Sequence, residues 1–149
     1  MIKQLIPNKI CLVCFGCCRF NQKDSAWVPR LLKEEEKLLG KIKLTFDSKA
    51  KFFFCSFFDP KKNKCRVYRR RPFECRLYPF LLCRKENKVF LSIDSNCSYA
   101  GGNFKNKKFK EYAEYLNRLL KSKKFLKTLE NNPQIAQAYP QVTSIYEIM

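Results

Sequence analysis

The chain has 149 residues and 46% of them are apolar, so its composition excludes an intrinsically disordered protein and its length suits one domain with a single core. Lysine and arginine number 31 against 13 acidic residues, which gives a formal net charge of +18. There are nine cysteines and no histidine. The lack of histidine excludes Cys₂His₂ zinc fingers and the Ser–His and Cys–His dyads of many hydrolases.

The start of the chain and its hydropathy predict a cytoplasmic protein. Residues 1–10 contain two lysines and a proline and lack the apolar stretch of a secretory signal peptide. No run of the sequence approaches the roughly 18 apolar residues of a membrane-spanning helix. We therefore expect a reducing compartment, where disulfides are disfavoured and a dense set of cysteines is more typical of metal binding.

The first predicted element is a tight loop or knuckle that carries Cys11, Cys14, Cys17 and Cys18 in the pattern C-x2-C-x2-C-C. Two thiolates of a C-x2-C pair can bind one ion from a single turn of chain. Four thiolates this close do not easily serve one tetrahedral ion, because the adjacent Cys17 and Cys18 tend to point in different directions. We therefore expect some of them to share a metal with later cysteines. The later cysteines are Cys55, Cys65, Cys75, Cys83 and Cys97.

The segment that follows the knuckle predicts a short helix and two short strands. The helix is expected over residues 29–39, because Pro29 suits a first turn and Gly40 suits a helix end. The strands are expected over residues 42–46 and 51–54, which are rich in aromatic and branched side chains.

The next part of the chain predicts a hairpin, a short helix and another strand. A turn at residues 59–63 would let residues 65–68 pair with the strand before it. A short helix over residues 72–78 would be ended by Pro79, because proline cannot continue a helix. Residues 88–93, with the sequence Lys-Val-Phe-Leu-Ser-Ile, predict a strand.

The C-terminal part predicts two helices. Over residues 105–121 apolar side chains recur at helical spacing, and the lysines lie on the opposite, solvent side. A shorter helix is expected over residues 123–130, and the tail from Pro133 onward is weakly patterned. The fold class predicted is therefore α+β, a small metal-organised, cysteine-rich domain with little regular sheet, covered by C-terminal helices. Residues 1–102 would form the cysteine-cluster metal-binding region, and residues 103–149 the helical part of the same domain.

The spacing of the first cysteines fits two kinds of metal centre. C-x2-C-x2-C matches the first three ligands of the bacterial ferredoxin run, although the fourth cysteine of that run and its proline are missing here. Zinc held only by thiolates is the alternative. The cofactor expected is therefore zinc or iron, with a [4Fe–4S] cluster among the iron options, and the spacing does not decide between them.

The cysteine segments resemble the YkgJ-like cysteine-cluster family, whose members are described as zinc- or iron-chelating proteins. The run Cys11–Cys18 resembles its first signature, and the segment from Cys55 through C-x2-Tyr at Cys65 to R-P-x2-C-R-x-Y-P resembles its second. A late cysteine followed by glycine, Cys97, also fits, so the resemblance covers roughly residues 11–102. The metal ligands that it implies are Cys11, Cys14, Cys17, Cys18, Cys55, Cys65, Cys75 and Cys97. Cys83 matches no position of the family and is expected not to be a ligand.

The Arg-Pro-x2-Cys-Arg segment has its own physical interpretation. With Pro72 in a first turn, Cys75 would lie one turn inside a short helix, whose N-terminus would lower the pKa of the thiol. Arg71 and Arg76 would either donate to ligand sulfurs, pair with Glu74 or coat the surface, and Arg76 is slightly favoured beside the sulfurs. Aromatic side chains expected to pack around the site are Tyr68, Phe73, Tyr78 and Phe80.

Three functions are compatible with these patterns. The leading one is a metal-binding protein of the YkgJ-like type, with electron transfer, metal delivery or service to a partner enzyme left open. The second is a nucleic-acid-binding module held together by zinc, which the charge favours, although no recognition helix follows the knuckle at the expected spacing. The third is a component of a lysine-methylase-like enzyme, because related cysteine clusters occur in flagellin lysine methylases. The sequence lacks the Gly-rich loop of a methyl-donor site, so catalysis and any catalytic residues stay unassigned.

Overall fold

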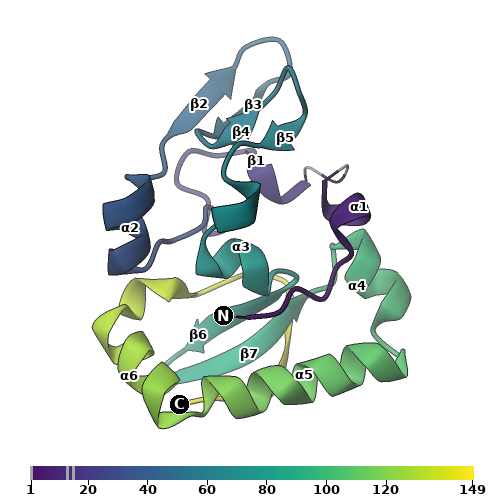
Figure 1. Ribbon diagram of the computed structural model, residues 1–149, viewed down its shortest axis with the longest axis vertical. Coiled ribbons are helices and arrows are strands. Elements are labelled where there is room, and N and C mark those ends of the chain that lie inside the picture. The colour runs from purple at the N-terminus through teal and green to yellow at the C-terminus, as the bar shows by residue number, and fades with distance from the viewer. Residues whose placement is uncertain (1, 13, 15) are drawn as a thin grey trace. The chain divides into compact units, whose positions relative to one another are not determined.

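The computed structural model describes residues 2–12, 14 and 16–149, and its chain divides into two compact units, Met1–Arg76 and Leu77–Met149 (Figure 1). We call them unit 1 and unit 2. Small sheets and helices occur in both units, and helices lie toward the C-terminus, which confirms the predicted α+β class. The expected division into residues 1–102 and 103–149 of one domain stays a prediction.

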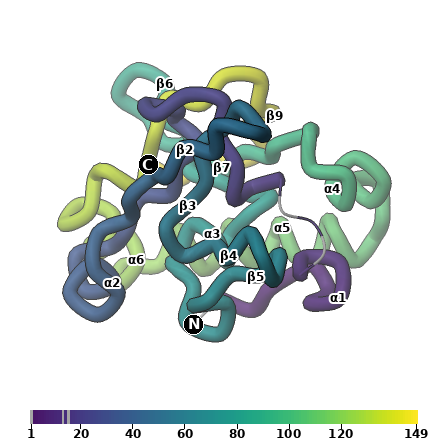
Figure 2. Tube along the Cα trace, turned by 90° about the horizontal axis from the view of Figure 1, so that it is seen from above, coloured from purple at the N-terminus to yellow at the C-terminus, as the bar shows by residue number. Residues whose placement is uncertain are grey.

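Unit 1 consists of short elements. In chain order these are α1 (Asn8–Cys11), η1 (Gly16–Cys18), β1 (Arg19–Phe20), α2 (Lys33–Leu39), β2 (Leu44–Asp47), β3 (Phe52–Cys55), β4 (Phe58–Asp59), β5 (Lys64–Cys65), η2 (Tyr68–Arg70) and α3 (Phe73–Leu77), which crosses the boundary between the units. The strands form an antiparallel sheet in the order β1-β3-β2 and a separate β4–β5 hairpin. Figure 2 shows β2 and β3 running side by side. Part of the predicted knuckle, at Val13 and Phe15, lies outside the described residues.

The predicted strands of unit 1 are confirmed, the predicted hairpin is placed differently, and the predicted helix is shorter than expected. Strands β2 and β3 begin within two residues of the predicted positions. The hairpin forms across the predicted turn, but its second strand is β5 rather than residues 65–68, and the chain from Tyr68 forms η2 instead. The helix starts at Lys33 rather than residue 29, because Leu32 is extended with a ψ of 151°. It ends at Gly40, whose φ of 75° only glycine adopts without strain.

One cluster of buried side chains in unit 1 consists of Phe20, Val28, Cys55 and Phe58, with half-buried aromatic side chains of the sheet packed around it. Other buried apolar side chains of this unit are Ile2, Ile6, Leu31 and Phe73. Cys55, which is expected to bind metal, therefore belongs to an apolar cluster of unit 1.

Unit 2 is built on a four-stranded sheet. Its elements are β6 (Phe80–Lys85), β7 (Lys88–Asp94), α4 (Ser98–Asn103), α5 (Lys107–Leu120), α6 (Lys123–Asn131), η3 (Pro133–Ile135), β8 (Ala136–Gln137) and β9 (Val142–Glu147). The strand order is β8-β6-β7-β9, with β8 parallel to β6 and the other pairs antiparallel. The strand over residues 88–93 and both C-terminal helices are confirmed, whereas β6, α4, β8 and β9 were not predicted.

Helix α5 covers the sheet of unit 2 with one apolar face. Phe109 and Tyr112 lie with their ring centroids 5.0 and 5.7 Å from that of Phe80 on β6. Leu116 and Leu120 are fully buried on the same face, and the lysines of the helix are exposed, as predicted. Side-chain caps satisfy backbone N–H groups in the first turns of α5 and α6. The side chain of Asn106 accepts from Lys108 N at the start of α5, and that of Ser122 accepts from Phe125 N at the start of α6. No helix within the described residues is long and apolar enough to cross a membrane.

Candidate metal centre

Cysteines from five separate elements of unit 1 lie within electrostatic range of one another. The pKa of Cys75 is raised well above its usual value by burial and then by the thiols of Cys17, Cys55 and Cys65. The pKa of Cys55 is likewise raised by burial and by Cys65 and Cys17. Like-charged thiolates this close disfavour each other's ionised form unless a cation lies among them. The fold thus gathers groups that a thiophilic cation would stabilise.

Cys11 joins this group from helix α1. Its pKa is raised by burial and by Cys17 and Cys14, while Tyr68 and Arg71 lower it. Neighbouring Cys14 is exposed. Cys11 is thus connected to the later cysteines of unit 1 through Cys17, which acts on both.

The adjacent Cys17 and Cys18 do not point apart as the sequence suggested. Their thiols are hydrogen-bonded, and this bond is the largest cause of the raised pKa of Cys18, followed by burial. Cys75 and Cys55 raise it further. Both members of the pair, which lie in the short 3₁₀ turn η1, thus take part in the cluster.

The expectation that a helix N-terminus lowers the pKa of the Cys75 thiol is wrong. The sequence predicted a lowered pKa, and the structure gives a raised one. Helix α3 has only five residues, so its N-terminal field is small compared with the cost of burying a thiolate among other thiols.

Backbone amides are aimed at two of the sulfurs. The N–H of Phe57 donates to the Sγ of Cys55 at 3.5 Å, and the N–H of Val67 donates to the side chain of Cys65. Each donor lies two residues after its cysteine, so both turns use the same local geometry. Hydrogen bonds of this kind favour the thiolate over the thiol and lower the pKa of both groups, against the larger effect of burial.

The remaining two cysteines lie in unit 2. Cys97 is buried at the residue before α4, with its N–H donating to Asp94 O. Cys83 is buried on β6, where its Sγ lies 3.9 Å from the carbonyl oxygens of Arg84 and Tyr139. The ligand role expected of Cys97, and the non-ligand role expected of Cys83, stay predictions.

The arginine that the cysteines contact electrostatically is Arg71. Its guanidinium lies 4.0 Å from the ring centroid of Tyr68 and donates through Nη1 to Tyr68 O at 2.8 Å. The hydroxyl of Tyr68 in turn donates to Asn8 Oδ1 at 3.0 Å, in the helix that carries Cys11. The positive charge of Arg71 lowers the pKa of both Cys11 and Cys65.

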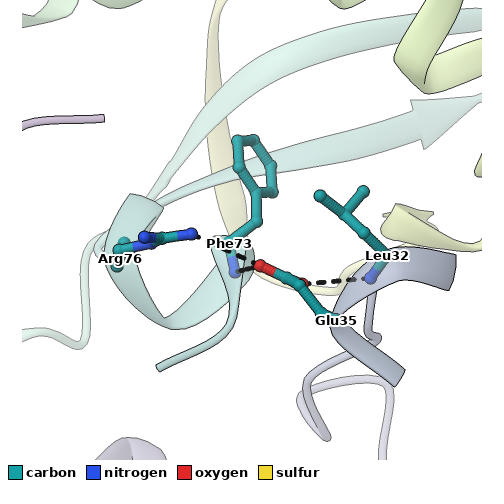
Figure 3. A network of polar contacts seen from close by, with 4 residues as sticks. All are labelled: Leu32, Glu35, Phe73 and Arg76. Carbon is teal, nitrogen blue, oxygen red and sulfur yellow. Dashed lines mark hydrogen bonds and ion pairs between the residues drawn. The ribbon is translucent and has the colours of Figure 1, made fainter. Parts of the chain in front are cut away.

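Arg76, which the sequence favoured beside the sulfurs, pairs with Glu35 instead. Its Nη2 lies 3.4 Å from Glu35 Oε1 (Figure 3). The same carboxylate accepts from Phe73 N at 2.7 Å and from Leu32 N at 3.0 Å, so it links the first turns of α2 and α3. Burial raises the pKa of Glu35, and these hydrogen bonds and Arg76 offset part of that rise.

Sequence reasoning missed one kind of supporting group and named a second, Arg71, without favouring it. The amides of Phe57 and Val67 carry no signal in the side-chain sequence, although a hairpin predicted beside Cys65 makes such turns available. Arg71 is one of three consecutive arginines, and only its position directly before Pro72 distinguishes it. Proline restricts the preceding residue to extended conformations, which turns Arg71 away from its exposed neighbours.

The donor set fits a thiophilic metal, but the ligands are not in final coordination geometry. Among the residues described, no three cysteine, aspartate or glutamate side chains are close enough together to hold an ion as they stand. Thiols keep their protons in the absence of a metal, and sites of this type form fully only when the ion displaces them. Soft sulfur donors without histidine suit zinc or iron–sulfur clusters and not magnesium or calcium.

Comparison with known proteins supports the same chemistry. Residues 10–98 match the family model CxxCxxCC, described as "Putative zinc- or iron-chelating domain". The chain is also 29% identical over 100 residues to "Uncharacterized protein MJ0661" of Methanocaldococcus jannaschii, covering 56% of this chain and 51% of that protein. The chain thus spans about half the length of this curated relative. No solved structure matches the chain.

Proposed function

Because the chain belongs to the CxxCxxCC family of zinc- or iron-chelating domains, we propose that it binds a zinc ion or an iron centre through the cysteines of unit 1. The ligands proposed are Cys11, Cys14, Cys17, Cys18, Cys55, Cys65 and Cys75, with Cys97 of unit 2 as a further one. We propose the reducing cytoplasm as its compartment, since the thiols must stay reduced to bind.

The observation that carries this proposal is the gathering of thiols from separate elements around Cys17. Its thiol acts on the pKa values of Cys55, Cys65 and Cys75, which come from the second cysteine segment. A set of thiols packed as inert small apolar side chains would gain nothing from amides aimed at sulfur, whereas Cys55 and Cys65 both have such donors. The arrangement is therefore better explained by ligands than by packing.

Different groups of the chain would support the proposed metal ligands in different ways. Amide donors at Cys55 and Cys65 would hold those sulfurs in the rotamers that face the ion, and Arg71 would offset part of the negative charge. Zinc would cross-link the segments, and an iron–sulfur cluster would in addition supply one-electron transfer. The aromatic side chains around the core of unit 1 would restrict water near the sulfurs.

Purification without oxygen, followed by elemental analysis and absorption spectroscopy, tests the proposal. We expect about one or more atoms of zinc or iron per chain. Brown protein with broad visible absorption would identify an iron–sulfur centre, and colourless protein with zinc a structural ion. Less than a tenth of an equivalent of any transition metal would contradict the proposal.

A matched pair of cysteine variants tests the ligand assignment. Cys65→Ser should lower metal content and thermal stability together, because metal-binding free energy in a small unit is largely folding free energy. Cys83→Ser should leave the metal content unchanged, although it removes a buried side chain. If Cys83→Ser releases the metal while Cys65→Ser retains it, the assignment is wrong.

A further inference from the structure

Arg71 is the one lysine or arginine that is buried within the described chain, with 8% of its surface exposed. Its neighbours Arg69 and Arg70 are exposed. Transfer of a charged guanidinium out of water is costly unless an opposite charge or a full set of acceptors compensates it. The fold must therefore provide a compensating group for Arg71.

The contacts that the described residues make with Arg71 do not neutralise it. Nη1 donates to a neutral carbonyl, and the ring of Tyr68 contributes a cation–π contact. Nε is buried and has no hydrogen-bond partner. None of the ion pairs between described side chains includes Arg71.

Besides Tyr68, the groups that can become anionic within electrostatic range of Arg71 are Cys11 and Cys65, which belong to different elements. The chain of contacts leads to the same place, because Tyr68 joins Arg71 to Asn8, at the start of the helix that ends at Cys11. A buried cation with an unused N–H thus faces two segments that carry proposed ligands.

We propose that Arg71 is a positioning residue of the metal centre, which balances the charge of the Cys11 and Cys65 thiolates and fixes, through Tyr68, the segment that carries Cys11. This inference rests on the proposed function. Four thiolates around one divalent ion leave a net charge of −2, and a buried guanidinium offsets half of it. Loss of Arg71 would then weaken metal binding without removing any ligand.

Cobalt and zinc titrations of the full-length apo chain, in the absence of oxygen, test this role. Arg71→Gln should raise the zinc dissociation constant about 10- to 100-fold, the usual effect of removing a group that orients ligands. The sulfur-to-cobalt charge-transfer band should move to longer wavelength, because a thiolate that loses a nearby cation gives up its electron more easily. A side chain that only fills space would not shift this band.

Two further variants make the test specific. Arg70→Gln removes an exposed charge one residue away and should leave the dissociation constant within about twofold of the wild type. Arg71→Lys keeps the charge and loses the planar fork, so it should recover part of the affinity and return the band toward its wild-type position. If Arg71→Gln does not fold, Arg71→Met, which also removes the charge and keeps an unbranched side chain, replaces it with the same expected changes.

Each outcome has a distinct meaning. Affinities within twofold of the wild type together with an unshifted band in the Arg71 variants would overturn this inference and leave the proposed function standing. Failure of the wild-type chain to bind either cobalt or zinc would overturn the proposed function itself. A weakened Arg71→Gln with a normal Arg70→Gln would support both.

Discussion

Unit 1 and unit 2 differ in how deeply they bury their side chains. Within the described residues, every large side chain that is fully buried belongs to unit 2, with the exception of Pro72. Unit 1 instead has three strands of two residues each and a core in which Cys55 is a member. Packing of a sheet against α5 is enough to explain why unit 2 folds, whereas unit 1 has few apolar contacts to hold its short elements. Seven of the nine cysteines thus lie in the unit that has the weaker apolar core.

Metal removal should produce the largest difference between the units. We expect a strong chelator under reducing conditions to speed hydrogen exchange in β3 and β5 at least 100-fold, about 2.7 kcal/mol, because structural zinc contributes far more than that to folding. Amides of β6 and β7 should change less than about threefold. Exchange measured by mass spectrometry on peptides from both units would show this, and an equal loss of protection in both would contradict the comparison.

A substitution in the apolar core of unit 2 should lower the stability of the protein and leave its metal content unchanged. Leu116→Ala opens a cavity beneath α5 at a fully buried position and should cost about 2–5 kcal/mol of unfolding free energy, measured in urea. The metal content of the folded protein should stay at the wild-type value. Leu38→Ala is the control, because that side chain is 82% exposed and its loss should cost less than about 0.5 kcal/mol. A metal content that falls with Leu116→Ala would show that the two units are not independent.

A smaller effect is expected at the link between α2 and α3. Glu35→Ala removes the acceptor for Phe73 N and Leu32 N and the partner of Arg76, and should cost about 1–3 kcal/mol. Glu34→Ala, at the exposed neighbouring position of the same helix, should have almost no effect. Chemical denaturation of the metal-loaded protein would measure both. Equal costs for the two variants would mean that the carboxylate of Glu35 does not join the helices.

The smallest effect concerns nucleic acid. Both units carry a surplus of basic residues, but the lysines of α5 are confined to its first turn, on the solvent side of a helix whose other side is the core of unit 2. We expect weak binding without sequence preference that disappears near 150 mM salt, because few phosphates would be neutralised at once. Filter binding at increasing salt measures this. Sub-micromolar, sequence-selective binding at 150 mM would favour a nucleic-acid-binding function instead.

Elements with a strong local signal could be predicted from the sequence. The apolar periodicity of α5, the stop at Gly40 and the turn of the β4–β5 hairpin all depend on neighbours in the chain. The strands at the end of the chain could not, because β9 is defined by its pairing with β7, some 50 residues earlier. Strand β6 was missed for another reason: four consecutive buried residues give it no alternation of apolar and polar positions.

The cysteine donors of the candidate site could be predicted from the sequence, whereas the residues that contact them could not. The density of cysteines by itself indicates metal binding, and the family match agrees with that prediction. The choice between Arg71 and Arg76 depends on which guanidinium finds Glu35, a residue about 40 positions away. Long-range packing raises the pKa of Cys75 as well, first through burial and then through the thiols of distant cysteines.

The β4–β5 hairpin has a consequence for how the metal would be captured. Cys55 and Cys65 are separated by ten positions, and in a free chain their approach would cost about 2 kcal/mol of loop-closure entropy. The ladder between Phe58 and Cys65, extended by the bond from Arg66 N to Phe57 O at 2.8 Å, closes that loop with backbone hydrogen bonds alone. The backbone would therefore hold Cys55 and Cys65 near each other before an ion binds, so that both could bind it as a bidentate pair. The thiols of the N-terminal knuckle would bind afterwards.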